Sequence, residues 1–365
     1  MIELRASVSP GELRVAAWDG RLVDFALSRS SDRFAVDSVH RGRVIARVPA
    51  MAGAFVALDG AEGFLPDSEM GPYKAILGTG TILAARVSRA PQGGKGPRLS
   101  AVPNPIETGP PCLITPAPDA LSQLGLRYPT SPIRIDDAGR AATLGRGFKL
   151  VADAFGDDIE QALAELASPL VALPGGASMT IHPTPALVAI DVDLDRQTAQ
   201  RRDKDIVQAD GNRGLITELC RHIRLRNLAG AIVVDLAGLT PRKRRALAPD
   251  FVRALAHDPL APRFLGFSAL GLAEILRQRA HPPLHERLAG PQAEGLGALR
   301  ALARESASQP HLSLALRCSP DVASALRQDD PARAALADRT GRPLLLIEDR
   351  AIANAAWRLE NTVRG

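Results

Sequence analysis

Two apolar runs that each end in an aspartate constrain the fold of this chain more than any other feature. The run ALVAID ends at Asp191, and the run AIVVD ends at Asp235. Between them, residues 205–226 have the apolar spacing of one long amphipathic helix. A strand, a helix and a second strand in this order predict a layered α/β domain. Because ligands bind at the carboxyl ends of strands in open α/β sheets, we expect both aspartates at one site.

The first run continues as DVDLD, so Asp193 and Asp195 alternate with apolar residues after Asp191. Alternate residues of a strand share a face, and several like charges on one face need a cation beside them. Neighbouring strands lie about 4.8 Å apart, so Asp191 and Asp235 are candidate ligands of one Mg²⁺ ion. Asp193 is expected to orient the metal water or to complete the metal shell, and Asp195 to be solvated or paired with an arginine. The alternative is that each strand-end aspartate caps a turn or a helix.

Arginine supplies nearly all of the positive charge, since only five of the 45 basic residues are lysines and the net charge is +5. A guanidinium binds two phosphate oxygens at once, so acids that hold a metal beside arginines fit phosphodiester chemistry. The alternatives are favourable contacts with a helix dipole and a general preference for arginine. Arginines gather at the end of the 205–226 segment and in GLAEILRQR, which we predict to be a helix. The candidate phosphate-binding residues are Arg224, Arg226, Arg277 and Arg279.

The chain divides into five expected parts, which together predict a multidomain α/β (α+β) fold. Residues 1–35 form an N-terminal β-hairpin that turns at Asp19-Gly20, because both turn positions tolerate positive φ. Residues 36–102 contain short strand-like runs separated by glycines, as in a small closed barrel such as an OB-fold. The other parts are a linker and reduced intermediate segment (103–175), a metal-dependent catalytic domain (176–290) and a small C-terminal α+β domain (291–365).

Three residues of the expected barrel are candidates for binding a nucleic acid strand. Phe55 and Phe64 lie on or near strands that can present a stacking face, and Lys95 lies in the glycine-rich loop GGKGPR. For each phenylalanine, packing in the core is the alternative. The three cysteines form no CxxC pair, so a cysteine-based zinc site is not expected. No apolar stretch has the length of a membrane span or a signal peptide, so we expect a cytoplasmic protein.

These segments resemble the ribonuclease E/G family of endoribonucleases. The resemblance is strongest over LPGGASMTIHPTPALVAIDVDLD, RHIRLRNLAGAIVVDLAGLTP and FSALGLAEILRQR, and it includes ELRVAAWDGRLVDF, the barrel segments and the C-terminal part in the family's order. The resemblance implies that the acids ending the two strands, Asp191 and Asp235, bind a catalytic Mg²⁺ ion. It also implies that Phe55, Phe64 and Lys95 belong to an S-one-type OB-fold domain that holds single-stranded RNA, with the RLR arginines near the site.

Three departures from the family's pattern qualify the expectation. The family usually has Asn where this chain has Asp193, so metal affinity or rate is expected to change. Neither an RTAGVG-like 5′-sensor motif nor a CPxC zinc-link is visible, so we expect little dependence on the RNA 5′ end and no zinc-linked tetramer. A homodimer through the C-terminal domain is a family expectation. The sequence thus predicts a Mg²⁺-dependent endoribonuclease of RNA processing or decay; the alternatives are a non-catalytic RNA-binding or assembly protein and a metal phosphoesterase acting on small molecules.

Overall fold

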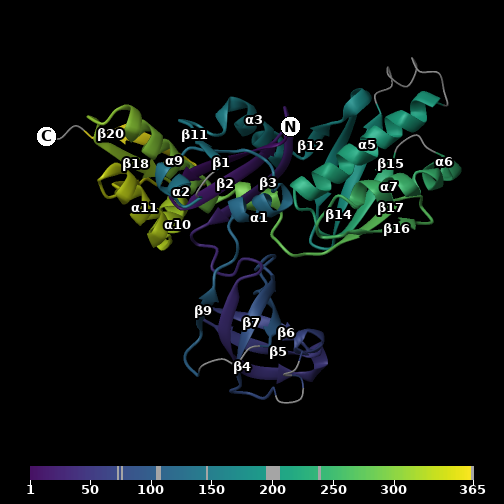
Figure 1. The fold of residues 1–365 in the computed structure, drawn as a ribbon, viewed down its shortest axis with the longest axis horizontal. Helices are drawn as coiled ribbons and strands as arrows, with labels where there is room; N and C mark the ends of the chain where they lie inside the picture. The colour runs from purple at the N-terminus through teal and green to yellow at the C-terminus, as the bar shows by residue number, and fades with distance from the viewer. Residues whose placement is uncertain are drawn as a thin grey trace. The chain divides into compact units, whose positions relative to one another are not determined.

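The computed structural model of the protein describes residues 1–71, 74, 77–103, 108–144, 147–194, 206–236 and 240–362. The chain forms two compact units, each assembled from segments that are distant in the sequence (Figure 1). The first unit contains residues 1–42, 106–162 and 286–365. The second contains residues 43–105 and 163–285.

The first unit begins with the N-terminal hairpin. Strands β2 (Glu12–Trp18) and β3 (Leu22–Arg29) form the predicted hairpin. Residues 19–21 connect them, and there Gly20, but not Asp19, has a positive φ, of 70°. Strand β1 (Glu3–Ser9) pairs with β2 on one side and with β10 (Ile133–Ile135) on the other, and β11 (Phe148–Leu150) completes a five-stranded sheet. Helices α1 (Ala120–Arg127) and α2 (Ala138–Ala142) supply apolar residues to its core. Part of the segment expected to be a linker therefore extends the N-terminal sheet.

The C-terminal part of the first unit is a small α+β arrangement. Its strands are β18 (Leu314–Cys318), β19 (Leu346–Glu348) and β20 (Trp357–Asn361), in the order β19-β18-β20. Its helices are α9 (Pro291–Ser308), α10 (Pro320–Gln328) and α11 (Asp330–Thr340), and the short helix α8 (Leu284–Leu288) precedes them. The helices bury leucines and alanines against β18, so this part has a core of its own.

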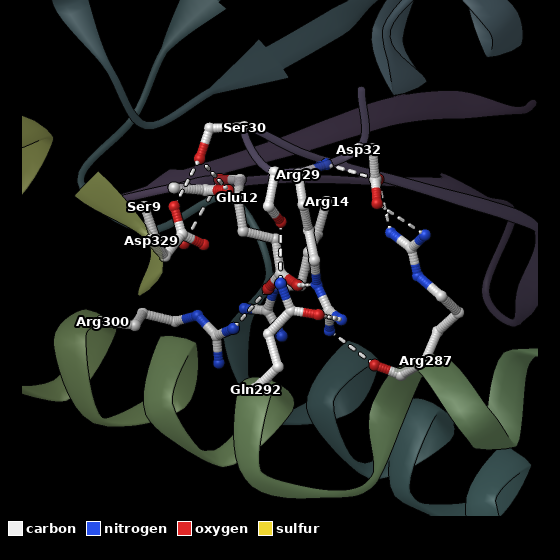
Figure 2. A network of polar contacts seen from close by, with 12 residues as sticks. Ser9, Glu12, Arg14, Arg29, Ser30, Asp32, Arg287, Gln292, Arg300 and Asp329 are labelled. Carbon is white, nitrogen blue, oxygen red and sulfur yellow. Dashed lines mark hydrogen bonds and ion pairs between the residues drawn. The ribbon is translucent and has the colours of Figure 1, made fainter. Parts of the chain in front are cut away.

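A buried network of charged side chains joins these parts of the first unit (Figure 2). Glu12 on β2 accepts hydrogen bonds from Arg29 Nε at 2.9 Å and from Arg300 Nη2 at 2.7 Å. Arg14, which lies beside Glu12, forms a bidentate ion pair with Glu160 of helix α3 (Gly156–Ala167). The arginines are thus compensated by carboxylates, which is what permits so many charges to be buried.

The barrel is closed. The strands β5 (Gly53–Leu58), β6 (Ala61–Pro66), β8 (Arg98–Val102), β7 (Ile82–Arg89) and β4 (Val39–Val48) pair in that order, and β4 also pairs with β5. The short helices η1 (Pro49–Met51) and η2 (Asp67–Glu69) flank β5 and β6, and β9 (Cys112–Thr115) adds to β4. This five-stranded ring confirms the expected barrel and is consistent with an OB-fold.

The remainder of the second unit is an α/β layer. Its six strands have the order β12-β13-β14-β15-β17-β16, and only β14 and β15 are parallel neighbours. The strands are β12 (Leu170–Ala172), β13 (Ala177–Pro183), β14 (Leu187–Leu194), β15 (Gly230–Leu236), β16 (Arg263–Phe267) and β17 (Ala273–Arg277). The helices are η4 (Pro174–Gly176), α5 (Ile206–Leu225), α6 (Pro241–Ala246) and α7 (Ala248–Leu255).

Helices α5 and α7 cover one face of this sheet, as Figure 1 shows. The residues that face them alternate along the strands, for example Val188, Ile190 and Val192 on β14, and all are buried. The intervening residues of β14 and β15 are only partly buried or exposed. One face of the sheet therefore carries the core, while the other carries the exposed positions of these strands.

The expectation of a helix in GLAEILRQR is wrong. Residues 273–277 form strand β17, which pairs with both β15 and β16. Along β17 the residues Ala273, Ile275 and Arg277 are buried, and the residues between them are not. This alternation has the period of a strand. The Glu and Leu residues favour a helix when considered locally, but pairing with two neighbouring strands outweighs that weak preference.

Candidate active site

The two strand-end aspartates lie directly beside each other. Asp191 on β14 and Asp235 on β15 are Cα partners in the parallel pairing of these strands. Paired positions on adjacent strands project to the same side, and the strands are about 4.8 Å apart. Asp193 lies two residues further along β14, and all three residues are exposed. The structure thus places the three acids predicted from the sequence on the face that helices α5 and α7 leave uncovered, with Asp191 and Asp235 as direct neighbours. Asp195 lies outside the described residues.

Hydroxyl groups border the acids on the neighbouring strand. Thr180 of β13 is the Cα partner of Asp191, and Ser178 is the partner of Asp193. Because the partners of an antiparallel pair share a face, these hydroxyls lie on the same side of the sheet as the acids. The carboxyl end of β14 is therefore a polar strip on the open face.

One arginine already contacts the acid pair. Arg244 Nη1 lies 3.2 Å from Asp235 Oδ1 and donates a hydrogen bond to the carbonyl oxygen of Gly271 at 2.7 Å. The Arg244 side chain is 16% exposed and that of Asp235 is 50% exposed. Helix α6 positions this arginine. Thr240 caps the helix by accepting a hydrogen bond from the Lys243 amide, and a proline follows the cap.

The donor set at this site fits a magnesium ion with an open coordination shell. Magnesium is commonly bound through one or two carboxylates, with waters and substrate phosphates completing its shell. Asp191 and Asp235 supply two such carboxylates. Within the described part of the chain, no group of three or more His, Cys, Asp or Glu side chains is arranged to hold a metal ion. Among the described residues the site therefore has no closed ligand set of a structural metal centre, and a metal held by Asp191 and Asp235 would take its other ligands from water and substrate.

The arginines at the end of α5 differ in their surroundings. Arg226 is 4% exposed, and its guanidinium donates to the carbonyl oxygens of Ser168 and Glu165 at 2.6 and 3.1 Å. Burial and the charge of Arg221 lower the pKa of Arg226 to about 10. These contacts assign Arg226 to packing against the end of α3, which argues against its expected role in binding RNA. Arg224 lies in the last turn of α5 and is partly exposed.

His222 lies in the same turn of the helix and is buried. Burial, and then the charges of Arg221 and Arg226, lower its pKa, while a bond to Glu218 acts in the opposite direction. The ring is therefore neutral near pH 7 and packs inside the domain.

Arg277 and Arg279 also separate into a buried and an exposed residue. Arg277 is 3% exposed, forms an ion pair with Asp258 at 2.7 Å, and donates to the Asn227 side chain and the Leu228 carbonyl. The guanidinium of Arg277 makes these bonds inside the protein. As for Arg226, its burial argues against contact with RNA. Arg279 is exposed, and its Nη2 donates to the carbonyl of Ala186 at 3.3 Å.

The candidate RNA-binding residues of the barrel lie on its surface. Phe55 and Phe64 are Cα partners on β5 and β6, and their rings meet edge to face with centroids 5.4 Å apart. Both are partly exposed, whereas Ala54 and Leu65 beside them are fully buried. Lys95 is exposed in the loop between β7 and β8. The two rings thus lie on the outer surface rather than in the barrel core.

Arg244 was not singled out from the sequence. The segment TPRKRR has four consecutive basic residues, and spacing alone does not tell which of them points back toward the strand. The cap at Thr240 is the usable signal, because it fixes where the helix starts and therefore the direction of each following residue. Thr180 and Ser178 had no signal of their own, since the pairing register that places them beside the acids is not visible in the sequence.

The fold and site define a multidomain α/β protein in which an acidic pair lies on an open sheet and a closed barrel carries surface aromatics. Residues 150–280 match the model of the Ribonuclease E/G family. Ribonuclease E of Nostoc sp. is 36% identical over 122 residues, which are 33% of this chain and 18% of that protein.

Two relatives from Escherichia coli give the same result. Its ribonuclease E is 35% identical over 135 residues, which are 36% of this chain and 12% of that protein. Its ribonuclease G is 29% identical over 123 residues, which are 33% of this chain and 25% of that protein. The aligned part thus covers no more than a quarter of any of these three curated relatives. Over the residues that the structure describes, no helix is both long and apolar enough to cross a membrane.

Proposed function

We propose that this protein is a Mg²⁺-dependent endoribonuclease that cleaves single-stranded RNA. The observation that carries the proposal is the register of β14 and β15, which makes Asp191 and Asp235 direct neighbours on an exposed sheet face. The similarity of residues 150–280 to ribonucleases E and G supports the choice of RNA as the substrate.

Each residue of the site has a distinct part in the proposed reaction. Asp191 and Asp235 would hold Mg²⁺, which when bound would polarise the phosphate and lower the pKa of water. Asp193, on the same face, accepts a hydrogen bond from the attacking water and orients it toward phosphorus. Arg244 donates to the phosphate oxygens as negative charge develops. In-line attack by water breaks the bond to the 3′ oxygen and leaves a 5′-phosphate and a 3′-hydroxyl.

The barrel supplies the second part of the proposal. Bases of a single strand stack on Phe55 and Phe64, a contact worth about 1–3 kcal/mol per base, and Lys95 adds charge at the loop. The partly exposed rings on the outer surface of this OB-fold-like barrel support this role. We further propose that the protein acts in RNA processing or decay in the cytoplasm, and that it forms a homodimer through the C-terminal part, without a zinc-linked tetramer. Light scattering of the purified protein tests the dimer.

Cleavage of an end-labelled single-stranded RNA with and without Mg²⁺ tests the reaction. We expect Asp191→Ala and Asp235→Ala to reduce cleavage by at least about 10²-fold, because each removes a charge that stabilises the transition state. Asp330→Ala is the matched control, since its side chain is 82% exposed on α11. Cleavage by either site variant at the wild-type rate would refute the metal assignment.

Asp193→Asn tests the orienting residue. This change restores the amide expected in the family and removes one negative charge beside Asp191. We expect activity to persist in this variant, because the amide oxygen of Asn also accepts a hydrogen bond from water. If the wild-type protein binds the strand but does not cleave it, whichever divalent cation is added, the chain is the non-catalytic RNA-binding or assembly protein instead.

A further inference from the structure

A row of outward-facing side chains crosses four strands of the barrel. Phe55 on β5 is paired with Phe64 on β6, Phe64 with Arg98 on β8, and Arg98 with Arg89 on β7. Cross-strand partners project from the same side of a sheet. The positions that alternate with them, including Ala54, Leu65, Leu99 and Val87, are fully buried inside the barrel. Two aromatic rings and two guanidiniums therefore form one continuous row on the outer surface.

A third arginine joins the row from outside the barrel. The Ala90 amide, directly after β7, donates to the carbonyl oxygen of Ala280 at 2.9 Å. This bond places Arg279, the residue before Ala280, next to Arg89. Burial, and then the charges of Arg98 and Arg279, lower the pKa of Arg89, which agrees with three guanidiniums in one neighbourhood. The β-bulge at positions 87–89 of β7 turns Arg89 to face Arg98.

The three arginines have no counter-charge in the described part of the chain. No carboxylate there contacts Arg89, Arg98 or Arg279, and Arg89 Nε is buried without a hydrogen-bond partner. The first unit shows the contrast, because there a carboxylate, Glu12, lies among the converging arginines. Like charges repel, and an unpaired buried donor destabilises the protein. An anion bound between the three guanidiniums would remove both penalties.

We propose that Arg89, Arg98 and Arg279 form a binding site for a backbone phosphate of a single RNA strand whose neighbouring bases stack on Phe64 and Phe55. Arg98 is the direct neighbour of Phe64, so a strand lying along the row meets rings first and guanidiniums next. The guanidinium fork matches two phosphate oxygens, and the rings match bases. This alternation favours a polynucleotide over a free phosphate. The inference rests on the proposed function, since it specifies how the barrel holds the same substrate.

Binding of a fluorescent 12-nucleotide RNA, measured by anisotropy in EDTA so that cleavage does not intervene, tests the site. We expect Arg98→Ala and Arg279→Ala each to weaken binding about ten-fold or more, as loss of a hydrogen bond to a charged group does. Each change is also expected to reduce the slope of log K against log salt by about 0.7, the value for one phosphate of a single strand. Arg253→Ala is the matched control, because this arginine is 66% exposed on α7 and pairs with Asp250. The RNA affinity and the salt slope of this variant are expected to stay at wild-type values.

A second strand that lacks bases separates the phosphate site from the stacking face. Arg98→Ala is expected to weaken binding of this abasic strand by the same factor, whereas Phe64→Leu is expected to weaken only the strand with bases. Arg98→Lys keeps the charge, and we expect it to retain most of the salt slope. Far-ultraviolet circular dichroism verifies that each variant is folded. If one of the two arginine-to-alanine variants does not fold, the other alanine variant and Arg98→Lys test the site.

Two outcomes are distinguishable. If the wild-type protein binds RNA and both alanine variants bind it with unchanged affinity and slope, the arginine site is wrong while the proposed function stands. If the wild-type protein binds no single-stranded RNA, the proposed substrate fails, and the site fails with it.

Discussion

Glu12 is predicted to be a main determinant of the stability of the first unit, and Glu12→Gln tests this. Its side chain is only 3% exposed and lies 2.9 Å from Arg29 and 2.7 Å from Arg300. Replacing the carboxylate by a neutral amide leaves several buried guanidiniums without their counter-charge. Breaking a buried ion pair from one side costs about 3–5 kcal/mol, a large share of the roughly 5–15 kcal/mol that holds a typical domain together.

The effect of the substitution is expected to depend on pH. Burial alone would raise the pKa of Glu12, but the charges of Arg29, Arg300 and Arg14 outweigh burial and hold this pKa below its ordinary value. A carboxyl with a lowered pKa stabilises the fold above the pKa of the unfolded chain, about 4.3. That stabilisation is lost as the pH falls through the lower pKa of the folded state. The difference between wild type and Glu12→Gln should therefore be full at pH 7 and shrink below about pH 4.

Unfolding in urea, followed by tryptophan fluorescence, measures this difference. The chain has two tryptophans, Trp18 and Trp357, and both lie in the first unit, so their signal reports the unit that contains Glu12. Glu348→Gln is the matched control, because Glu348 pairs with Arg327, whose side chain is 54% exposed. An exposed pair contributes about 0–1 kcal/mol. A loss in Glu12→Gln no larger than in this control, or a loss that stays constant down to pH 3, would refute the reasoning.

Two further predictions concern the second unit. Burial, and then the charge of Asp258, raises the pKa of the Cys220 thiol to about 12. Iodoacetamide at pH 8 should therefore modify the partly exposed Cys112 and leave Cys220 intact, which mass spectrometry of the labelled protein measures. Equal labelling of the two cysteines would contradict this prediction. Arg244→Ala should tighten Mg²⁺ binding about two- to five-fold in calorimetric titration, because it frees the Asp235 carboxylate from an ion pair, and the exposed neighbour Arg245→Ala should leave the affinity unchanged.

Local signals in the sequence predicted most of the elements. The hairpin at Asp19-Gly20 and the run of short strands in the barrel each depend on a few adjacent residues, and the structure contains both. The pairing of Asp191 with Asp235 followed from the order strand, helix, strand. Long-range pairing was not predictable in the same way, because β10 joins β1 across more than a hundred residues.

The burial of single arginines was the part of the candidate site that the sequence could not show. Arg226 and Arg277 are as charged as Arg279, and all three lie near predicted strand or helix ends. What separates them is the set of carbonyls and carboxylates brought by other segments, such as Ser168 for Arg226 and Asp258 for Arg277. Such partners belong to the tertiary structure, so a basic residue near an active site is only a candidate until its surroundings are known.

The buried ionic network has a consequence for how the chain is made. Glu12 is synthesised 288 residues before Arg300, one of the two arginines that donate hydrogen bonds to it. Until α9 is synthesised, the part of the N-terminal sheet around Glu12 lacks its contact with α9. The second unit, in contrast, has all its segments by residue 285. The second unit is therefore free to fold first during translation, and premature termination before α9 would yield a polypeptide that carries the acidic pair but an incomplete first unit.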